Sequence, residues 1–170
     1  VEIVVQQLEK AGFQAYVVGG CVRDLLLGRE PQDWDVTTNA KPEEVQKIFP
    51  ENFYENKFFT VTVQTDSENL RLKEIEVTTF RSDHKYADRR RPGEVKYAKT
   101  IEEDLSRRDF TVNALYYNIA DFSVVDYTRG MIDLKNKLIR IIGDPAQRFH
   151  EDPVRMLRAI RFSAKLHFEI

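Results

Sequence analysis

The sequence predicts an α+β domain in which helices flank a mixed β-sheet. Short runs of apolar and β-branched residues, such as Ala15–Val18 and residues 58–65, have the pattern of strands. Segments with apolar residues at helical spacing separate them, beginning with residues 1–11. The chain has 170 residues, of which 42% are hydrophobic and 32% are charged, so we expect one globular domain with a sizeable core.

Composition narrows the class of protein and its compartment. The formal net charge of −2 gives no overall attraction to nucleic acid, so any such contact must come from local charge clusters. Cys21 is the single cysteine, which rules out an intrachain disulfide and fits a reducing, cytoplasmic location. No apolar run approaches the length of a membrane span, and no signal-peptide pattern opens the chain. Because the chain begins at Val1 without Met and stops at Ile170 just after a helical pattern, we expect a fragment of a longer protein.

Most predicted elements serve as scaffold. They are helices over residues 1–11 and 39–49, strands over residues 58–65, 70–80, 116–120, 123–126 and 138–142, and a short turn or helix over residues 130–134. Gly12 is a fitting C-cap for the first helix, and Pro42 suits the first turn of the second. Residues 81–92 are predicted to be a polar loop with a basic cluster at Arg89, Arg90 and Arg91.

One stretch, residues 17–38, has the pattern of strand, glycine turn, short helix, loop and strand. Gly19 and Gly20 allow a sharp turn and a close approach of the backbone to a ligand. The helix predicted over Cys21–Leu27 begins at that turn, so its free N–H groups point toward the same place and favour a phosphate. Arg23 lies one turn into this helix and can add a charged fork for phosphate oxygens.

The second half of that stretch supplies negative charge. Asp33 and Asp35 are two residues apart, and side chains at that spacing share one side of a strand. Paired carboxylates suit a hard divalent cation, and beside a phosphate cradle they indicate phosphoryl or nucleotidyl transfer. The alternative is that the pair has no binding role, because many surface strands also carry two carboxylates at this spacing. Glu76 is a candidate third carboxylate, with a solvent-facing strand glutamate as the alternative.

A further polar cluster follows a predicted helix start. Thr100 and Glu103 form a capping-box pattern. Beyond them, Arg108 can contact a triphosphate, and Asp109 or Asn113 can bond a ribose hydroxyl. The alternative is an ion pair at the end of a helix.

The last element, residues 150–162, is predicted to begin a helix. One third of its surface carries Asp152, Arg155, Arg158 and Phe162. Another third carries Leu157, Ile160 and Ala164, which we expect to pack. Arg161 lies nearer the apolar side.

Asp152 and Arg155 can pair with each other, or they can recognise a nucleobase. Cytosine and adenine both present an amino donor beside a ring acceptor, which a carboxylate and a guanidinium can satisfy. Uracil and guanine place a carbonyl where the carboxylate needs a donor. Unpaired buried groups would then penalise both of these bases.

Five segments in order resemble motifs of one family. They are GGCVRD, DWD, the loop with Asp83, Tyr86, Asp88, Arg90, Arg91 and Pro92, RRDFTVNAL, and EDPVRMLRAIRF. Together they are similar to the DNA-polymerase-β-like nucleotidyltransferases, and more narrowly to class II CCA-adding enzymes and bacterial poly(A) polymerases. The resemblance implies a nucleotidyltransferase head over residues 1–142 and the start of a helical neck over residues 143–170. The body and tail that grip the acceptor arm of tRNA would be missing.

The resemblance also implies an activity, which is addition of CCA to the 3′ end of tRNA from CTP and ATP by two-metal transfer. Asp33 and Asp35 would be the catalytic residues and would hold Mg²⁺. The nucleotide-binding residues would be Gly20, Arg23, Arg108, Asp152, Arg155, Arg158 and Arg161. Asp152 and Arg155 would choose the base as a protein template. No membrane partner is implied.

Related activities remain as alternatives. Bacterial poly(A) polymerases usually carry a segment like G-R-R-F, which residues 54–59 do not match. CC-adding enzymes lack the loop that this chain has, whereas A-adding enzymes are compatible with it. An alternative from another class is a catalytically silent domain that binds nucleotide or RNA, which the intact D-x-D pattern disfavours.

Overall fold

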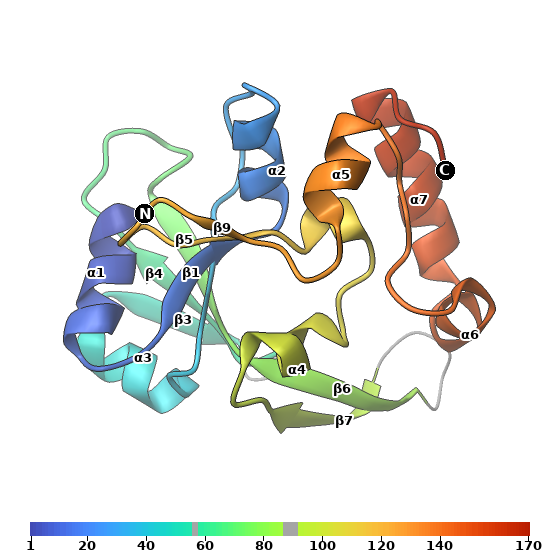
Figure 1. Cartoon of the computed structure of the whole chain (residues 1–170). Helices are drawn as coiled ribbons and strands as arrows, with labels where there is room; N and C mark the ends of the chain where they lie inside the picture. The colour runs from blue at the N-terminus through green and yellow to red at the C-terminus, as the bar shows by residue number, and fades with distance from the viewer. Residues whose placement is uncertain (56–57, 87–91) are drawn as a thin grey trace.

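The computed structural model describes residues 1–55, 58–86 and 92–170. Its larger sheet has seven strands in the order β3-β4-β5-β2-β1-β8-β9 (Figure 1). Their bounds are β1 Ala15–Val18, β2 Asp35–Thr38, β3 Asn52–Glu55, β4 Thr60–Gln64, β5 Glu74–Thr79, β8 Tyr116–Tyr117 and β9 Val124–Val125. The β2–β5 pair is parallel and the other pairs are antiparallel, so the predicted mixed sheet is confirmed.

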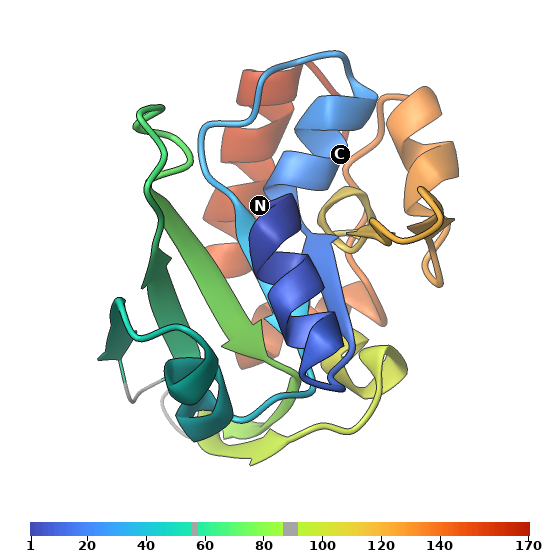
Figure 2. The ribbon, with the colours of Figure 1, turned by 90° about the vertical axis from the view of Figure 1, so that its left-hand side faces the viewer.

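Helices lie on both sides of this sheet. Figure 2 shows α1 and α3 in front of the sheet and α7 behind it. The helices are α1 Glu2–Lys10, α2 Gly20–Leu26, α3 Pro42–Ile48, α4 Ile101–Leu105, α5 Gly130–Lys135, α6 Pro145–Glu151 and α7 Val154–Leu166, with a 3₁₀ helix, η1, over Thr111–Asn113. Among the helices within the described residues, none is long and apolar enough to span a bilayer.

Alternating strand residues and helical stripes build the main core. Val36 and Val77, from the central strands β2 and β5, are fully buried, as are Val5 and Leu8 of α1 and Val45 of α3. Each of these apolar side chains leaves water on folding, which is the main stabilising term of such a layered domain. The sheet therefore holds the start of β2, and with it Asp35, in a fixed position.

One predicted strand is shorter than expected. Residues 70–80 were predicted as one strand, but β5 covers only Glu74–Thr79. The N–H of Leu72 donates to the carbonyl of Asn69, and the N–H of Arg71 donates to the Asn69 side chain. This Asn-based turn holds the segment out of the sheet and leaves Leu70 exposed.

Residues 81–92 are not a loop throughout. β6 Arg81–Tyr86 and β7 Pro92–Tyr97 form a separate antiparallel hairpin that projects from the end of β5. The sequence did not reveal this hairpin because its strands lack the apolar alternation that predicts a half-buried strand. Conversely, the strand predicted over residues 138–142 is present only as isolated bridges at Leu138 and Ile141.

The helix predicted from residue 150 is instead two helices with a break at Asp152 and Pro153. A residue before proline avoids the helical conformation, and Asp152 has φ −146° and ψ 94°. Its Oδ1 accepts from the N–H of Val154 at 3.1 Å. The packing prediction for this helix was also wrong, because Leu157 and Ile160 are 67% and 60% exposed. The buried face instead carries Arg155, Ala159, Phe162 and Leu166.

Candidate nucleotide-binding site

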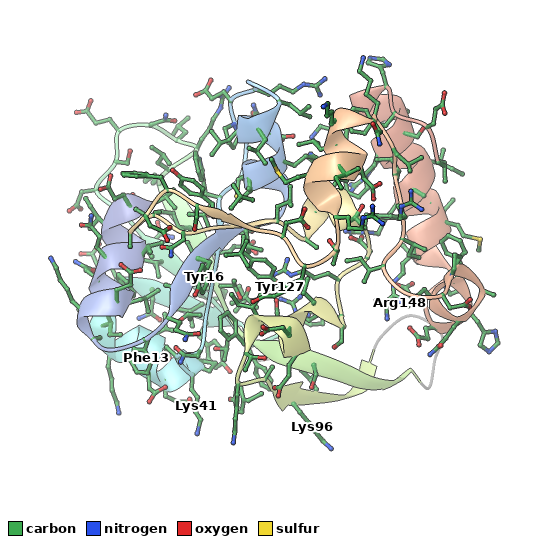
Figure 3. The ribbon with its side chains drawn as sticks, viewed as in Figure 1. Phe13, Tyr16, Lys41, Lys96, Tyr127 and Arg148 are labelled. Atoms are coloured by element: carbon green, nitrogen blue, oxygen red, sulfur yellow. The ribbon has the colours of Figure 1, made fainter. Side chains whose placement is uncertain are left out.

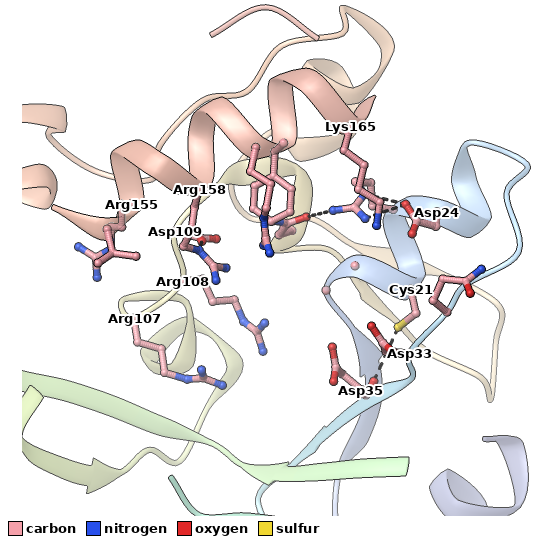
Figure 4. A pocket seen from close by; sticks show the side chains of 18 of the residues that line it. Cys21, Asp24, Asp33, Asp35, Arg107, Arg108, Asp109, Arg155, Arg158 and Lys165 are labelled. Atoms are coloured by element: carbon pink, nitrogen blue, oxygen red, sulfur yellow. Dashed lines mark hydrogen bonds and ion pairs between the residues drawn. The ribbon is translucent and has the colours of Figure 1, made fainter. Parts of the chain in front are cut away.

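One pocket of about 830 Å³ gathers all the predicted catalytic and nucleotide-binding residues, but not the candidate carboxylate Glu76. Lining it are Gly20, Arg23, Asp33, Asp35, Arg108, Asp152, Arg155, Arg158 and Arg161. Figure 4 shows Asp33 and Asp35 across this pocket from Arg155 and Arg158. The acidic and basic clusters, more than a hundred residues apart in sequence, therefore face one shared hollow.

The acidic side is built by the glycine turn and the start of β2. Gly19 has φ +86°, and a Cβ added to it would lie 3.6 Å from Oδ2 of Asp35. The added Cβ would make only an ordinary contact there, so it is the positive φ that favours glycine in this turn. Asp33, in the loop before β2, is exposed.

Burial and neighbouring charges together raise the pKa of the Asp35 carboxyl group. Burial, then the neighbouring Glu76, raise its pKa to about 6, and Asp33 adds to this effect while Arg108 and Arg107 oppose it. A carboxyl group whose ionised form is disfavoured by its own surroundings is typical of a site that awaits a positive ligand. Within the described residues, no group of three or more His, Cys, Asp and Glu side chains is arranged to hold a metal ion.

Glu76 lies next to Asp35 in the sheet but does not line the pocket. It is opposite Asp35 in the parallel register of β2 and β5, and its side chain is exposed. Its charge acts on Asp35, as the raised pKa of Asp35 indicates. It is not among the residues that line the pocket.

Arg23 is predicted to offer a charged fork to phosphate oxygens, but the residue is buried, with 3% of its surface exposed. Its Nε donates to Asp24 at 2.8 Å, and its terminal nitrogens contact Asp24 at 2.7 Å and Asn113 at 2.6 Å. The guanidinium carbon lies 5.6 Å from the ring centroid of Phe162 in α7. Arg23 therefore connects α2, η1 and α7 at the lining of the pocket.

The arginine pair that follows α4 depends on a carboxylate that the sequence analysis missed. Asp104 is fully buried and accepts from Nε of Arg107 at 2.7 Å and from two nitrogens of Arg108 at 2.9 and 3.1 Å. The hydroxyl of Tyr116 donates to the same carboxylate at 3.1 Å. Burial alone would raise the pKa of Asp104, but Arg108 and Arg107 hold it below its ordinary value.

Asp104 had a sequence signal. It lies three and four residues before Arg107 and Arg108, which is the spacing of helical ion pairs. Tyr116 gave no such signal, because only the sheet brings β8 beside α4. The predicted cap of this helix is confirmed, since the Thr100 side chain accepts from the N–H of Glu103.

The basic side of the pocket is held by a network at the α6–α7 junction. Arg155 is buried, and its Nη1 donates to the carbonyl of Arg148 at 2.9 Å and contacts Glu151 at 3.2 Å. Asp152 is only loosely paired with Arg155, at 3.9 Å. Arg148, on α6 in Figure 3, also donates to the carbonyl of Arg108 at 2.8 Å. The network thus ties α6 and α7 to the segment after α4.

Part of the predicted basic loop lies outside the described residues. This applies to Asp88, Arg90 and Arg91, and the side chains of Asp83, Tyr86 and Pro92 are likewise not described. The pocket contains other residues that the sequence analysis did not single out for a role, among them Phe58, Arg81 and Lys165.

Relatives of this chain share both its sequence and its fold. The family model for the poly A polymerase head domain matches residues 15–140. The poly(A) polymerase I of Haemophilus influenzae is 47% identical over 96% of this chain and 37% of its own length. The CCA-adding enzyme of Lactobacillus helveticus is 48% identical over 98% of this chain and 41% of its own.

Solved structures agree with this relationship. The CCA-adding enzyme of Bacillus stearothermophilus in complex with CTP superposes with a TM-score of 0.85 at 41% identity, over 98% of this chain and 38% of that one. A tRNA nucleotidyltransferase complexed with a primer tRNA and an incoming ATP analog gives a TM-score of 0.76 at 34% identity, over 98% and 46%. This chain thus spans about two fifths of the length of the curated relatives it matches. It belongs to the family of the poly A polymerase head domain.

Proposed function

We propose that the natural protein carrying this chain adds CCA to the 3′ end of tRNA from CTP and ATP. The observation that carries this proposal is one pocket with Asp33 and Asp35 on one side and Asp152 and Arg155 on the other. A nucleotide between them would meet acids at its phosphates and a donor–acceptor pair at its base. Residues 1–142 would be the nucleotidyltransferase head and residues 143–170 the start of a helical neck. The cytoplasmic location stays a prediction.

The acidic pair suits a hard divalent cation. Mg²⁺ takes oxygen ligands and is commonly held by one or two carboxylates together with substrate phosphates, so a two-carboxylate protein site fits it. When bound by Asp33 and Asp35, such ions would activate the 3′-hydroxyl and stabilise the leaving pyrophosphate. Glu76 would act on this site by its charge on Asp35 and is a candidate third carboxylate.

The remaining pocket residues would bind and orient the nucleotide. Arg108 would meet the triphosphate, since Asp104 already fixes its guanidinium at the pocket wall. Gly20 and Arg23 would form the floor under the phosphates, and Arg158 and Arg161 would line the side of α7.

Base choice would fall to Asp152 and Arg155. Arg155 is oriented by Arg148 and Glu151, while the carboxylate of Asp152 is only loosely paired at 3.9 Å. Oδ1 of Asp152 accepts from the N–H of Val154, so the loosely paired Oδ2 can accept the amino group of cytosine or adenine. Uracil or guanine would leave it facing a carbonyl, at a cost of about 1–3 kcal/mol for each unpaired buried group.

Poly(A) polymerase activity is the second candidate. Relatives named poly(A) polymerase I and CCA-adding enzyme match this chain at nearly equal identity, 47% and 48%. An A-adding enzyme and a silent nucleotide-binding domain are further alternatives.

A substrate series separates these activities. The natural protein should extend tRNA that lacks CCA, and tRNA that ends in CC, by the missing nucleotides only. It should use CTP and ATP and reject GTP and UTP. Asp33→Ala should abolish incorporation while the fold survives. Long A tails on unrelated RNA would assign poly(A) polymerase activity instead, and equal binding of all four nucleotides without incorporation would indicate a silent domain.

A further inference from the structure

The pocket lining includes an aromatic residue with no assigned role. Phe58, between β3 and β4, lines the pocket and is 39% exposed. Arg81 and Arg107 line it as well. Figure 4 shows Arg107 on the side of the pocket away from Lys165.

Phe58 and Arg81 form one unit that is joined by two contacts. The guanidinium carbon of Arg81 lies 5.2 Å from the ring centroid of Phe58, and its Nη1 donates to the Phe58 carbonyl at 2.5 Å. The backbone N–H of Arg81 donates to Asp104 at 3.2 Å. Because Asp104 also holds Arg107 and Arg108, the aromatic unit is fixed relative to the pocket arginines.

The backbone next to Phe58 is strained. Phe59 has φ +56°, a left-handed conformation that bulky residues rarely adopt. The Phe59 ring stacks on Tyr97 of β7 with centroids 4.4 Å apart and planes at 24°, and its carbonyl accepts from the N–H of Thr79. Phe59 is thereby packed against the hairpin, while Phe58 lines the pocket. Strain of this kind is often found where a side chain must be aimed at a ligand.

We propose that Phe58 and Arg81 form a stacking platform for a nucleobase of the RNA strand that accepts the new nucleotide. The inference rests on the proposed function, since a transferase needs an acceptor as well as a nucleotide. The attacking hydroxyl must approach the phosphorus opposite the leaving pyrophosphate, so the two substrates occupy different parts of one pocket. Because Asp152 and Arg155 at the α6–α7 junction suit the incoming base, Phe58 and Arg81, which adjoin the strands β4 and β5 of the sheet, are left for the acceptor.

Stacking is also the suitable interaction for this partner. An acceptor that is extended step by step presents a different terminal base after each addition. Every base has a π-face, so an aromatic ring beside a guanidinium binds them all with little preference. Hydrogen-bond readout would instead have to be rebuilt at each step.

The test distinguishes a loss of acceptor binding from a loss of nucleotide binding. In the natural protein that carries this chain, Phe58→Ala should raise the KM for the tRNA acceptor about tenfold or more and leave the KM for CTP and ATP unchanged within about twofold. Phe58→Tyr keeps a ring and should restore acceptor binding. Phe53→Ala is the matched control, because Phe53 is an exposed aromatic residue of β3 outside the pocket lining. Thermal unfolding of each variant monitors the fold.

A second readout reports the stack itself. An acceptor with 2-aminopurine as its terminal base should lose fluorescence on binding the wild type and the Tyr variant, and should lose much less on binding the Ala variant. Incorporation by the wild type without a change in acceptor KM for Phe58→Ala overturns the platform and leaves the proposed function intact. A rise in the KM for CTP and ATP alone also overturns it, since the ring would then serve the incoming base. A wild type that neither incorporates nucleotides nor quenches the probe overturns both proposals.

Discussion

The carboxylate of Asp109 and the guanidinium of Arg158 form an ion pair with an Oδ2–Nε distance of 2.6 Å. The pair joins the segment after α4 to helix α7 across 49 residues of sequence. The guanidinium carbon also lies 5.5 Å from the ring centroid of Phe162. Only the Nε of Arg158 donates within the described part of the chain, so its two terminal nitrogens are left for a ligand in the pocket.

Asp109→Ala should therefore weaken nucleotide binding by releasing Arg158. We expect the Kd for CTP and ATP to rise about tenfold, because a charge-assisted hydrogen bond that is partly exposed contributes about 1–2 kcal/mol. Titration calorimetry of the single variants and of the Asp109→Ala, Arg158→Ala double variant measures the coupling. If the two losses simply add, Asp109 contacts the nucleotide independently of Arg158 and the ion pair does not position it.

Asp104→Asn should disturb the fold and the pocket together. The buried carboxylate neutralises Arg107 and Arg108, and removal of one partner of a buried ion pair costs about 3–5 kcal/mol. Because the folded protein holds the pKa of Asp104 below 3.8, this stabilisation is present above that pH and is lost as the pH falls through the folded value. Urea unfolding at pH 7 and pH 3 measures both effects.

Tyr116→Phe is the matched control for Asp104→Asn. It removes a donor to the carboxylate and an acceptor of Nε of Arg108, but keeps the ring and the charge of Asp104, so a loss of about 1–2 kcal/mol is expected. An equal loss for the two variants would show that the hydrogen bonds of Asp104, rather than its charge, hold the two arginines.

The residues of the candidate site could be listed from the sequence because motifs place them at fixed spacings. Asp33 and Asp35 are close in sequence, so a strand alone determines their separation. What brings them opposite Arg155 is the packing of α7 behind the sheet, which local patterns do not contain. The family resemblance supplied that information before any coordinates did.

Helix α7 departs from its sequence pattern where burial and polarity disagree. Arg155 was expected on a polar face, yet it is buried because the Arg148 carbonyl and Glu151 satisfy its nitrogens. Leu157 and Ile160 were expected to pack, yet they are exposed. Periodicity assumes that apolar side chains mark the inner face, and a helix whose inner face lines a polar pocket reverses that assumption.

Gly130→Ala should destabilise the domain more than other glycine substitutions. A Cβ at Gly130 would lie 2.3 Å from the carbonyl oxygen of Thr111 in η1, so α5 and η1 would have to separate. We expect a loss of about 3 kcal/mol or more, as for overpacked cores. Gly28→Ala is the control, since Gly28 has φ +67° but no atoms within 4 Å, and strain alone should cost about 1 kcal/mol. Similar melting temperatures for the two variants would contradict the close contact of α5 with η1.

Asp35→Asn should remove activity and increase stability at the same time. The folded protein raises the pKa of Asp35 from 3.8 to about 6, so between these values the folded state binds more protons than the unfolded state. Stability therefore falls as the pH rises through this window, and above it the ionised carboxylate destabilises the fold. Without metal ions, Asp35→Asn should raise the free energy of unfolding at pH 8 by about 1–2 kcal/mol and have little effect at pH 4. At limiting Mg²⁺, incorporation by the wild type should increase with pH, because the cation competes with the proton for this carboxylate.

Asp33→Asn separates the two effects of Asp35→Asn. Asp33 is exposed, so its charge destabilises the fold little, although the loss of a metal-binding carboxylate should abolish incorporation equally. Urea unfolding in the presence of a chelator, at pH 4 and pH 8, compares both variants with the wild type. A stability gain for Asp35→Asn of the same size at both pH values would show that burial, and not the charge of the carboxylate beside Glu76, disfavours Asp35 in the fold.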